Sequence, residues 1–208
     1  GMLAHTLVGY RTTKYFGEVT GSASPKFYKK YNDAIEKNLE AIDGGSDFPE
    51  WFNLHNGATI SFTIDKYCYV TLRKLPPLYT FKYRLRYFKS EMAQSISQIR
   101  HPSIKGAINT FDKTKDSFEI VHSSDIPGLS GLGSSSAFSV SLINLIHNYN
   151  NIKMSKKKLA KKAIYLEKKV LKETIGYQDQ YACAYGGFNS IDYSKQKIII
   201  KPIKLSNK

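Results

Sequence analysis

The chain has 208 residues, of which 41% are hydrophobic and 13% aromatic, so it can bury one good core and is not a disordered chain. No apolar run approaches the roughly 20 residues that cross a bilayer, which excludes a membrane-spanning protein, and the polar N-terminus is not that of a secretory signal. Its two cysteines, Cys68 and Cys183, are too few for a disulfide framework, so we expect a cytoplasmic location.

The charge is strongly positive, with 31 Lys and Arg against 17 Asp and Glu, a formal net charge of +14. Such a field attracts nucleic acids, anionic membranes or phosphorylated small molecules. The lysines are scattered except in "KMSKKKLAKKAIYLEKK", residues 153–169, where apolar residues recur at helical spacing. This pattern favours a helix with a solvated lysine face over a nucleic-acid surface.

In the first half of the chain, residues 24–42 have the apolar spacing of an amphipathic helix. A second, short helix is expected from Pro49, and Asp47 just before it can serve as its cap. Residues 58–73 and 79–90 alternate like strands, the first as a strand or a hairpin.

The second half alternates helices and strands. It contains a mixed, mainly helical stretch, a strand, two long helices and a final strand, at 91–111, 117–127, 134–149, 155–173 and 196–205. Pro202 predicts that the last strand lies at a sheet edge. Interleaved helices and strands indicate a layered mixed α/β or α+β domain.

A glycine-rich stretch, "IPGLSGLGSSSAF" at 126–138, lies between a predicted strand and a long apolar helix. Gly131 and Gly133 allow the backbone to turn sharply and to approach a ligand closely. The serines at 134–136 fall on the first helical turn, where free N–H groups make an anion site. No lysine follows the glycines, so the stretch is not a Walker A motif. From the residues alone, a plain strand–turn–helix with serine caps fits equally.

The longer stretch "PGLSGLGSSSAFSVSL" resembles the phosphate-binding motif of the GHMP kinases, a family that includes galactokinase, homoserine kinase and mevalonate kinase. The matching positions are Pro127, Gly131, Leu132, Gly133, Ser134, Ser135 and Ala137. Residues 44–52, 58–70 and 165–189 resemble the sugar-kinase branch of the family, and most of all its heptose-phosphate kinases. The resemblance covers roughly residues 44–205.

The resemblance implies an α+β fold, the GHMP-kinase N-terminal domain, which is a ribosomal-protein-type two-layer α/β fold with a left-handed β-α-β crossover. It assigns residues 44–208 to this ATP-binding domain. Residues 1–43 match nothing in the family and are expected to form a largely helical N-terminal extension. Asn38 stands where the family has an arginine ahead of a glycine-rich strand end.

The chain ends at Lys208 without the family's C-terminal ferredoxin-like domain. An open site exposes the transferring phosphoryl group to water, so the truncation is expected to impair activity. The missing domain would also leave apolar surface uncovered, and from this we expect self-association into a homo-oligomer.

The resemblance also implies site residues. The nucleotide-binding set is Pro127, Gly131, Leu132, Gly133, Ser134, Ser135 and Ser136, which would hold the phosphates of ATP. Ser135 and Glu167 would bind Mg²⁺, since oxygen ligands suit this ion. Asp179 would accept the proton of the sugar hydroxyl or orient that hydroxyl. Gly45, Ser46 and Asp47 would bind the sugar.

Each carboxylate also has a plainer interpretation. Glu167 could be a solvated charge on the lysine-rich helix, Asp179 a turn or cap residue, and Asp47 the cap of the helix at Pro49. Glu167 and Asp179 are 12 residues apart, too far for one helical face. They can converge on Ser135 only if the chain turns after about Glu173.

The sequence therefore predicts ATP-dependent phosphoryl transfer to a sugar or sugar-phosphate hydroxyl, of the heptose 7-phosphate kinase type, with ATP and Mg²⁺. One alternative is a non-catalytic relative that binds a nucleotide or sugar in regulation, which the missing C-terminal domain favours. The other is a basic nucleic-acid-binding domain, against which the scatter of the lysines argues. The presence of Ser135, Glu167 and Asp179 favours the kinase.

Overall fold

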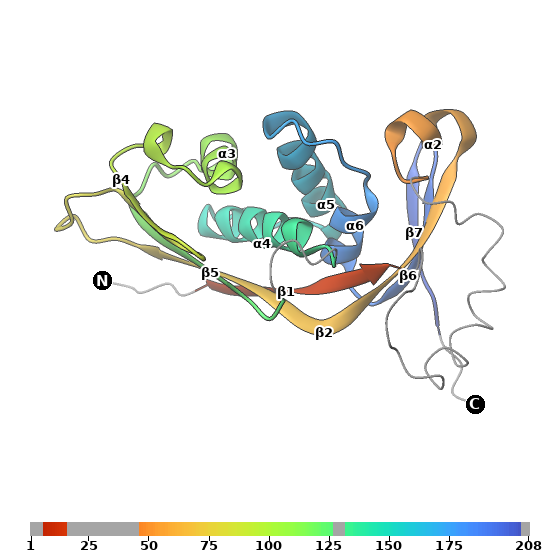
Figure 1. Cartoon of the computed structure of the whole chain (residues 1–208), viewed down its shortest axis with the longest axis horizontal. Helices are drawn as coiled ribbons and strands as arrows, with labels where there is room; N and C mark the ends of the chain where they lie inside the picture. Colours follow the sequence, from red (N-terminus) through yellow and green to blue (C-terminus); the bar gives the residue numbers. More distant parts are fainter. Residues whose placement is uncertain (1–5, 16–45, 127–131, 205–208) are drawn as a thin grey trace.

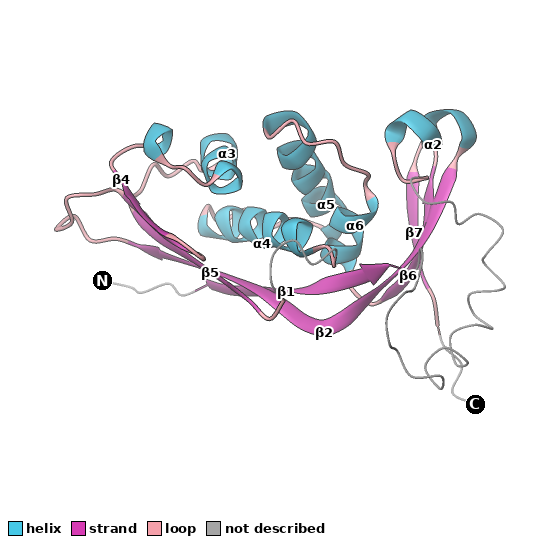
Figure 2. Cartoon of the chain, in the orientation of Figure 1, coloured by secondary structure: helices cyan, strands magenta, loops and turns pink. Residues whose placement is uncertain are grey.

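The structure is a computed structural model that describes residues 6–15, 46–126 and 132–204. Within these ranges seven strands form one sheet in the order β4-β3-β5-β2-β6-β7, and β1 pairs with β2 outside this path. Figures 1 and 2 show α3, α4 and α5 on the same face of the sheet. The architecture is mixed α+β, as predicted.

The strands differ widely in length, and β2 is the longest. Their bounds are β1 Thr6–Tyr15, β2 Gly57–Lys74, β3 Tyr83–Arg86, β4 Ser90–Ala93, β5 Phe118–Ser124, β6 Phe188–Tyr193 and β7 Ile198–Pro202. β2 runs for 18 residues as one strand, not a hairpin. It pairs antiparallel with β1, β5 and β6, so it joins both ends of the sheet.

Strand β3 pairs parallel with β5, and the connection between them contains α3. This is the pairing that a β-α-β crossover requires. The strand predicted over 79–90 is divided, because the chain reverses after β3 and returns as β4. At the other edge Pro202 lies on β7 opposite Asn189, and the prediction of an edge strand is confirmed.

The helices surround α4, which is buried along most of its length. The helical elements are α2 Pro49–His55, the 3₁₀ turn η2 Ile96–Gln98, α3 Pro102–Phe111, α4 Ser134–Tyr149, α5 Lys156–Ile164, the π-helical turn η3 Tyr165–Val170 and α6 Gln178–Tyr185. Helix α4 has the predicted bounds. Its Leu142, Ile143 and Leu145 are fully buried, which explains why so apolar a segment forms the centre of the helical layer.

The helix predicted over 155–173 changes character at Tyr165. Helix α5 begins after Ser155, whose side chain accepts from the Lys158 N–H, and it continues into the π-helical turn η3. The N–H of Leu171 donates to the carbonyl of Leu166, five residues back. Lys172 then takes a φ of +60° and reverses the chain, close to the turn expected after about Glu173.

The N-terminal extension was predicted to be helical, and residues 6–15 contradict this by forming β1. The prediction came from the spacing in 24–42, whereas 6–15 are rich in Thr, Val and Tyr, residues that favour strands. The helix predicted over 24–42 lies outside the described residues.

Both cysteines are buried, and neither forms a disulfide within the described part of the chain. Burial raises the pKa of the Cys68 thiol to about 12, which makes it unreactive. No helix in the described ranges is long and apolar enough to cross a membrane.

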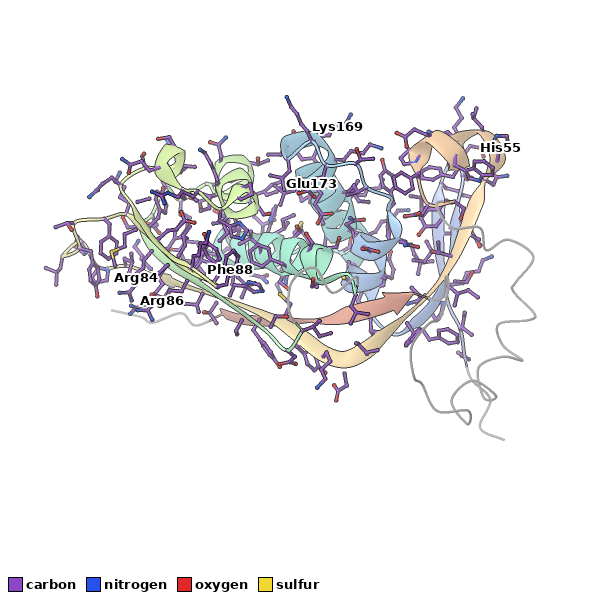
Figure 3. All side chains as sticks on the ribbon, in the orientation of Figure 1. His55, Arg84, Arg86, Phe88, Lys169 and Glu173 are labelled. Carbon is purple, nitrogen blue, oxygen red and sulfur yellow. The ribbon has the colours of Figure 1, made fainter. Side chains whose placement is uncertain are left out.

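A charged cluster ties three strands together. Glu119 on β5 is 5% exposed, and its carboxylate forms ion pairs with Arg73 on β2 and Arg84 on β3. Arg86 Nε lies 3.3 Å from Glu119 Oε1. Figure 3 labels Arg84 and Arg86 at this end of the sheet. Burial acts to raise the pKa of Glu119, but the hydrogen bonds from the arginines outweigh it and hold the pKa below its usual 4.5.

We expect Glu119→Gln to lower the free energy of unfolding by about 2 kcal/mol at pH 7, because it leaves partly buried arginines without a carboxylate. Because the pKa of Glu119 is lower in the folded state than in the unfolded state, its ionised carboxylate stabilises the fold at pH values above the unfolded-state pKa. This contribution is lost as the pH falls through the folded-state pKa. Urea unfolding should therefore show the stabilities of the two proteins converging as the pH falls below 4.5. Glu50→Gln, which removes an exposed partner of Lys168, should cost much less. Equal losses in both variants would contradict this.

Candidate active site

The N-terminus of α4 is where the glycine-rich stretch meets the core. Gly133 is the N-cap of α4 and has a φ of +68°, a left-handed conformation that favours glycine. Ser135 on the first turn is exposed, whereas Ser136 is buried. Leu132 and Ser134 are half-buried, and Pro127 and Gly131 lie outside the described residues.

A cleft of about 360 Å³ opens beside this helix end. Four segments contribute to it: residues 47–48, the start of α4, η3, and the 173–180 segment that leads into α6. Its lining residues are Asp47, Phe48, Ser135, Ser136, Glu167, Glu173, Thr174, Ile175, Gly176, Gln178, Asp179 and Gln180. The structure thus brings Ser135, Glu167 and Asp179 to one cleft, the convergence expected from the turn between the two carboxylates.

Glu167 lies at the base of the cleft and is 2% exposed, so it is not a solvated surface charge. Its Oε2 accepts hydrogen bonds from the Ser136 hydroxyl, at 3.3 Å, and from the side-chain amide of Gln180. The same amide donates to Ser136 Oγ at 3.1 Å. These contacts fix one carboxylate oxygen against α4.

The other carboxylate oxygen of Glu167, Oε1, is buried without a hydrogen-bond partner among the described residues. Burial raises the pKa of Glu167 to about 7, against the opposing effect of its hydrogen bonds. A buried carboxylate with an unsatisfied oxygen needs either a proton or a cation. The π-helical turn that carries it is a feature found often at functional sites.

Together, Glu167 and the exposed hydroxyl of Ser135 are a donor set that fits Mg²⁺. The ion prefers oxygen ligands, often one or two from the protein, with water and phosphate oxygens completing the shell. No cluster of three or more His, Cys, Asp or Glu residues suited to a metal occurs in the described ranges, so a cage made of protein ligands alone is not found there.

Asp47 is 3% exposed and is held in place by the start of α6. Its Oδ2 accepts from the backbone N–H of Gln178 at 3.0 Å, and its carbonyl accepts from that of Tyr177 at 3.2 Å. Asp47 therefore caps α6 and not the helix at Pro49, whose N-cap, Phe48, makes no side-chain cap bond. The capping interpretation had the right chemistry but the wrong helix.

The other residues predicted to bind the sugar lie next to Asp47. Ser46 is buried, and its hydroxyl donates to the carbonyl of Ala58 at 2.9 Å. Gly45 lies outside the described residues. Asp179 is on the first turn of α6, half-buried, and lines the cleft. An acid at this position also interacts favourably with the helix dipole, so both interpretations of Asp179 remain compatible with its place.

Gly176 allows Asp47 to reach α6. A Cβ at this position would lie 1.8 Å from Asp47 Oδ2 and 2.4 Å from its Cγ. Gly176→Ala should therefore displace the buried carboxylate and destabilise the fold by about 2 kcal/mol, measured by urea unfolding.

A double-mutant cycle can test the cause of that loss. In an Asp47→Ala background the atoms that collide are gone, so adding Gly176→Ala should cost little. Additive losses would show that the clash with Asp47 is not the reason.

Sequence reasoning missed the role of Gln180. It directly follows Asp179, but its amide faces Ser136 and Glu167, so only the structure connects the three. Ser136 was predicted to bind nucleotide, and in the structure its hydroxyl also supports Glu167. Figure 3 labels Glu173, which lies on the rim of this cleft.

Residues 102–187 match the family model described as the GHMP kinases N terminal domain. The D-glycero-alpha-D-manno-heptose 7-phosphate kinase of Campylobacter jejuni is 28% identical over 178 residues, which is 81% of this chain and 52% of that protein. The chain thus spans about half the length of this curated relative.

Solved structures of two kinases share the fold of this chain. A D-glycero-D-manno-heptose 1-phosphate kinase from Bacteroides thetaiotaomicron aligns with a TM-score of 0.75 and 23% identity, over 95% of this chain and 60% of that one. Mevalonate kinase from Methanococcus jannaschii aligns with a TM-score of 0.61 and 17% identity, over 97% and 56%. At these identities the alignments establish the fold alone.

The match to the family model begins at the first residue of α3 and ends just after α6. It therefore includes Ser135, Glu167 and Asp179, three of the residues that line the cleft. Residues 102–187 are therefore similar to the N-terminal domain of the GHMP kinases, and the chain shares its fold with solved kinases.

Proposed function

We propose that the chain is a kinase that transfers the γ-phosphoryl group of ATP to a hydroxyl of a sugar phosphate, of the heptose-phosphate type. The observation that carries this is the cleft in which the N-terminus of α4, the buried Glu167 and the carboxylate of Asp179 meet. The relatives named above support the substrate class, since one is a heptose 7-phosphate kinase. We further propose that the domain takes in β1 with residues 44–208, because β1 pairs within the same sheet.

The phosphates of ATP would lie at the start of α4, where free backbone N–H groups and the helix dipole favour anions. The proposed nucleotide-binding residues remain Pro127 and 131–136. Ser135 and Glu167 would hold Mg²⁺. When bound, the ion would neutralise part of the negative charge of the phosphates. Ser136 and Gln180 hold the Glu167 carboxylate in place for that role.

Asp179 would position the acceptor hydroxyl and take up its proton as the bond to phosphorus forms. Its place on the rigid first turn of α6 fixes its distance from α4, and Asp47 in turn holds that turn. The sugar would bind to Gly45, Ser46 and Asp47, of which Asp47 lines the cleft. Positioning of this kind supplies a large part of the acceleration in phosphoryl transfer.

A coupled assay of ADP release tests the proposal. Purified protein would be given Mg-ATP with a panel of acceptors: heptose 7-phosphate, hexose phosphates, free sugars and mevalonate. We expect release to require a sugar phosphate and to fall to background without Mg²⁺. Release with mevalonate, or equal release without any acceptor, would contradict the proposed substrate class.

Glu167→Gln should weaken Mg-ATP binding by about tenfold or more, because it replaces a charged ligand by a neutral one of the same size. Calorimetry with ATP, with and without Mg²⁺, measures this, and the variant should lose most of the difference between the two conditions. Glu173→Gln removes a charge from the rim of the same cleft and should have a small effect. A Glu167→Gln protein with wild-type Mg²⁺ dependence would exclude Glu167 as a ligand.

A further inference from the structure

A second hollow, of about 520 Å³, lies between α5 with η3, helix α2 and the turn that joins β6 to β7. Figure 1 shows α2 and β7 together at one end of the molecule, with α5 toward its middle. The volume falls in the range of roughly 300–1,000 Å³ that is usual for small-molecule sites. We call it the lysine groove, because six lysines line it: Lys157, Lys161, Lys168, Lys169, Lys195 and Lys197.

The charge of the lysine groove is not balanced by the protein. No Asp or Glu is among its lining residues. Lys168 pairs with Glu50 at 3.1 Å, while the other five lysines make no ion pair within the described part of the chain. Like charges that face one another raise the free energy of the fold, and an anion between them removes that penalty.

These lysines come from two distant parts of the sequence. Those on α5 and η3 belong to the run interpreted as a solvated helix face, and Lys195 and Lys197 belong to the β6–β7 turn. A solvated face needs no second group of lysines opposite it. Their convergence on one hollow indicates a binding function that the sequence spacing did not show.

The floor of the groove is aromatic. Phe52 and Tyr177 meet edge to face with ring centroids 5.5 Å apart, and the fully buried Tyr181 is also among the lining residues. The Tyr181 hydroxyl has no hydrogen-bond partner among the described residues. A buried hydroxyl without a partner is unfavourable.

The lysine groove is separate from the candidate active site. The two hollows share no lining residue. A wall divides them, made of residues 47–49 and 176–178, which are joined by the hydrogen bond from the Tyr177 N–H to the Asp47 carbonyl. A ligand in the groove therefore leaves the cleft free for ATP and the acceptor.

We propose that the lysine groove binds a small phosphorylated molecule, a sugar phosphate or a nucleotide, at a site independent of the phosphoryl transfer described above. Its phosphate, with a charge of about −1.5 to −2 at neutral pH, would lie among the lysine ammonium groups, which bind phosphate as point charges. Its carbon skeleton or base would lie on the aromatic floor.

Calorimetry can test this with three probes: glucose 6-phosphate, ADP without Mg²⁺, and glucose. The double variant Lys161→Gln/Lys195→Gln removes one lysine from each side of the groove. Lys82→Gln/Lys89→Gln, at positions on either side of β3, removes the same charge elsewhere. We expect a phosphorylated probe, but not glucose, to bind at least about tenfold more weakly to the groove variant, with the control variant unchanged. Which probe binds more tightly distinguishes the sugar phosphate from the nucleotide.

Three results would overturn the proposal. One is equal binding of both phosphorylated probes by the groove variant and the wild type. Another is loss of that binding in Gly133→Val or in Asp179→Asn, which would place the ligand in the cleft instead. The third is tighter binding of a single-stranded oligonucleotide at the same salt, lost in the groove variant, which would make the groove a nucleic-acid site. None of these depends on whether the chain transfers phosphate.

Discussion

Asp179→Asn is expected to lower turnover by roughly 10²-fold or more while Mg-ATP binding stays close to that of the wild type. The amide keeps the size of the carboxylate and can still hold a hydroxyl, but it cannot take up a proton. Asp179 lines the cleft from the first turn of α6, whereas the phosphates would lie at the start of α4, so its loss should not disturb the phosphate site. Turnover with a heptose phosphate acceptor and ATP affinity by calorimetry measure the two effects separately.

A matched control uses the same change in charge far from the cleft. Asp192 on β6 pairs with Lys201 at the sheet edge, and Asp192→Asn should leave turnover unchanged. If Asp179→Asn kept wild-type turnover, Asp179 would be no more than a favourable charge at a helix N-terminus.

Gly133→Val is expected to abolish measurable ATP binding in a protein that still folds. Gly133 has a φ of +68° at the start of α4, and a β-branched residue in this conformation is strained. The left-handed conformation costs about 1–2 kcal/mol for a residue with a side chain, less than the stability of most domains. The branched side chain would also occupy space beside the backbone that the phosphates approach.

Two further variants separate the strain from the bulk. Gly133→Asn introduces a residue that tolerates a positive φ, and Gly133→Ala introduces strain with only one added carbon. ATP affinity by calorimetry should fall with the size of the side chain, and circular dichroism should show a folded protein throughout. Unchanged ATP affinity in a folded Gly133→Val protein would show that the glycine-rich stretch is a plain strand–turn–helix and not a phosphate-binding loop.

The elements that the sequence predicted well are those whose apolar spacing is decided by burial. Helix α4 has its predicted bounds because almost every turn faces the core, and β2 was recognised because its side chains alternate. The split of 79–90 into β3 and β4 was missed, since the reversal has no glycine or proline to mark it. The π-helical turn was missed because Tyr165–Val170 continue the helical spacing, and only tertiary packing widens that turn.

For the candidate site, the family motif brought Ser135, Glu167 and Asp179 into one hypothesis, and the structure places them in one cleft. The contacts that position them could not be read from the sequence. Asp47 caps a helix that begins at Gln178, and Gln180 reaches Ser136 and Glu167. Such contacts join segments far apart in the chain, and no local pattern encodes them.

The most direct test is to detect the product of the proposed transfer. Heptose 7-phosphate and Mg-ATP would be incubated with the protein, and the sugar products analysed by mass spectrometry. A kinase of the proposed type must form a heptose bisphosphate and ADP in equal amounts. The Asp179→Asn variant should form little or no heptose bisphosphate. ADP accompanied only by inorganic phosphate, or no product from a folded protein that binds Mg-ATP, would contradict phosphoryl transfer to a sugar phosphate.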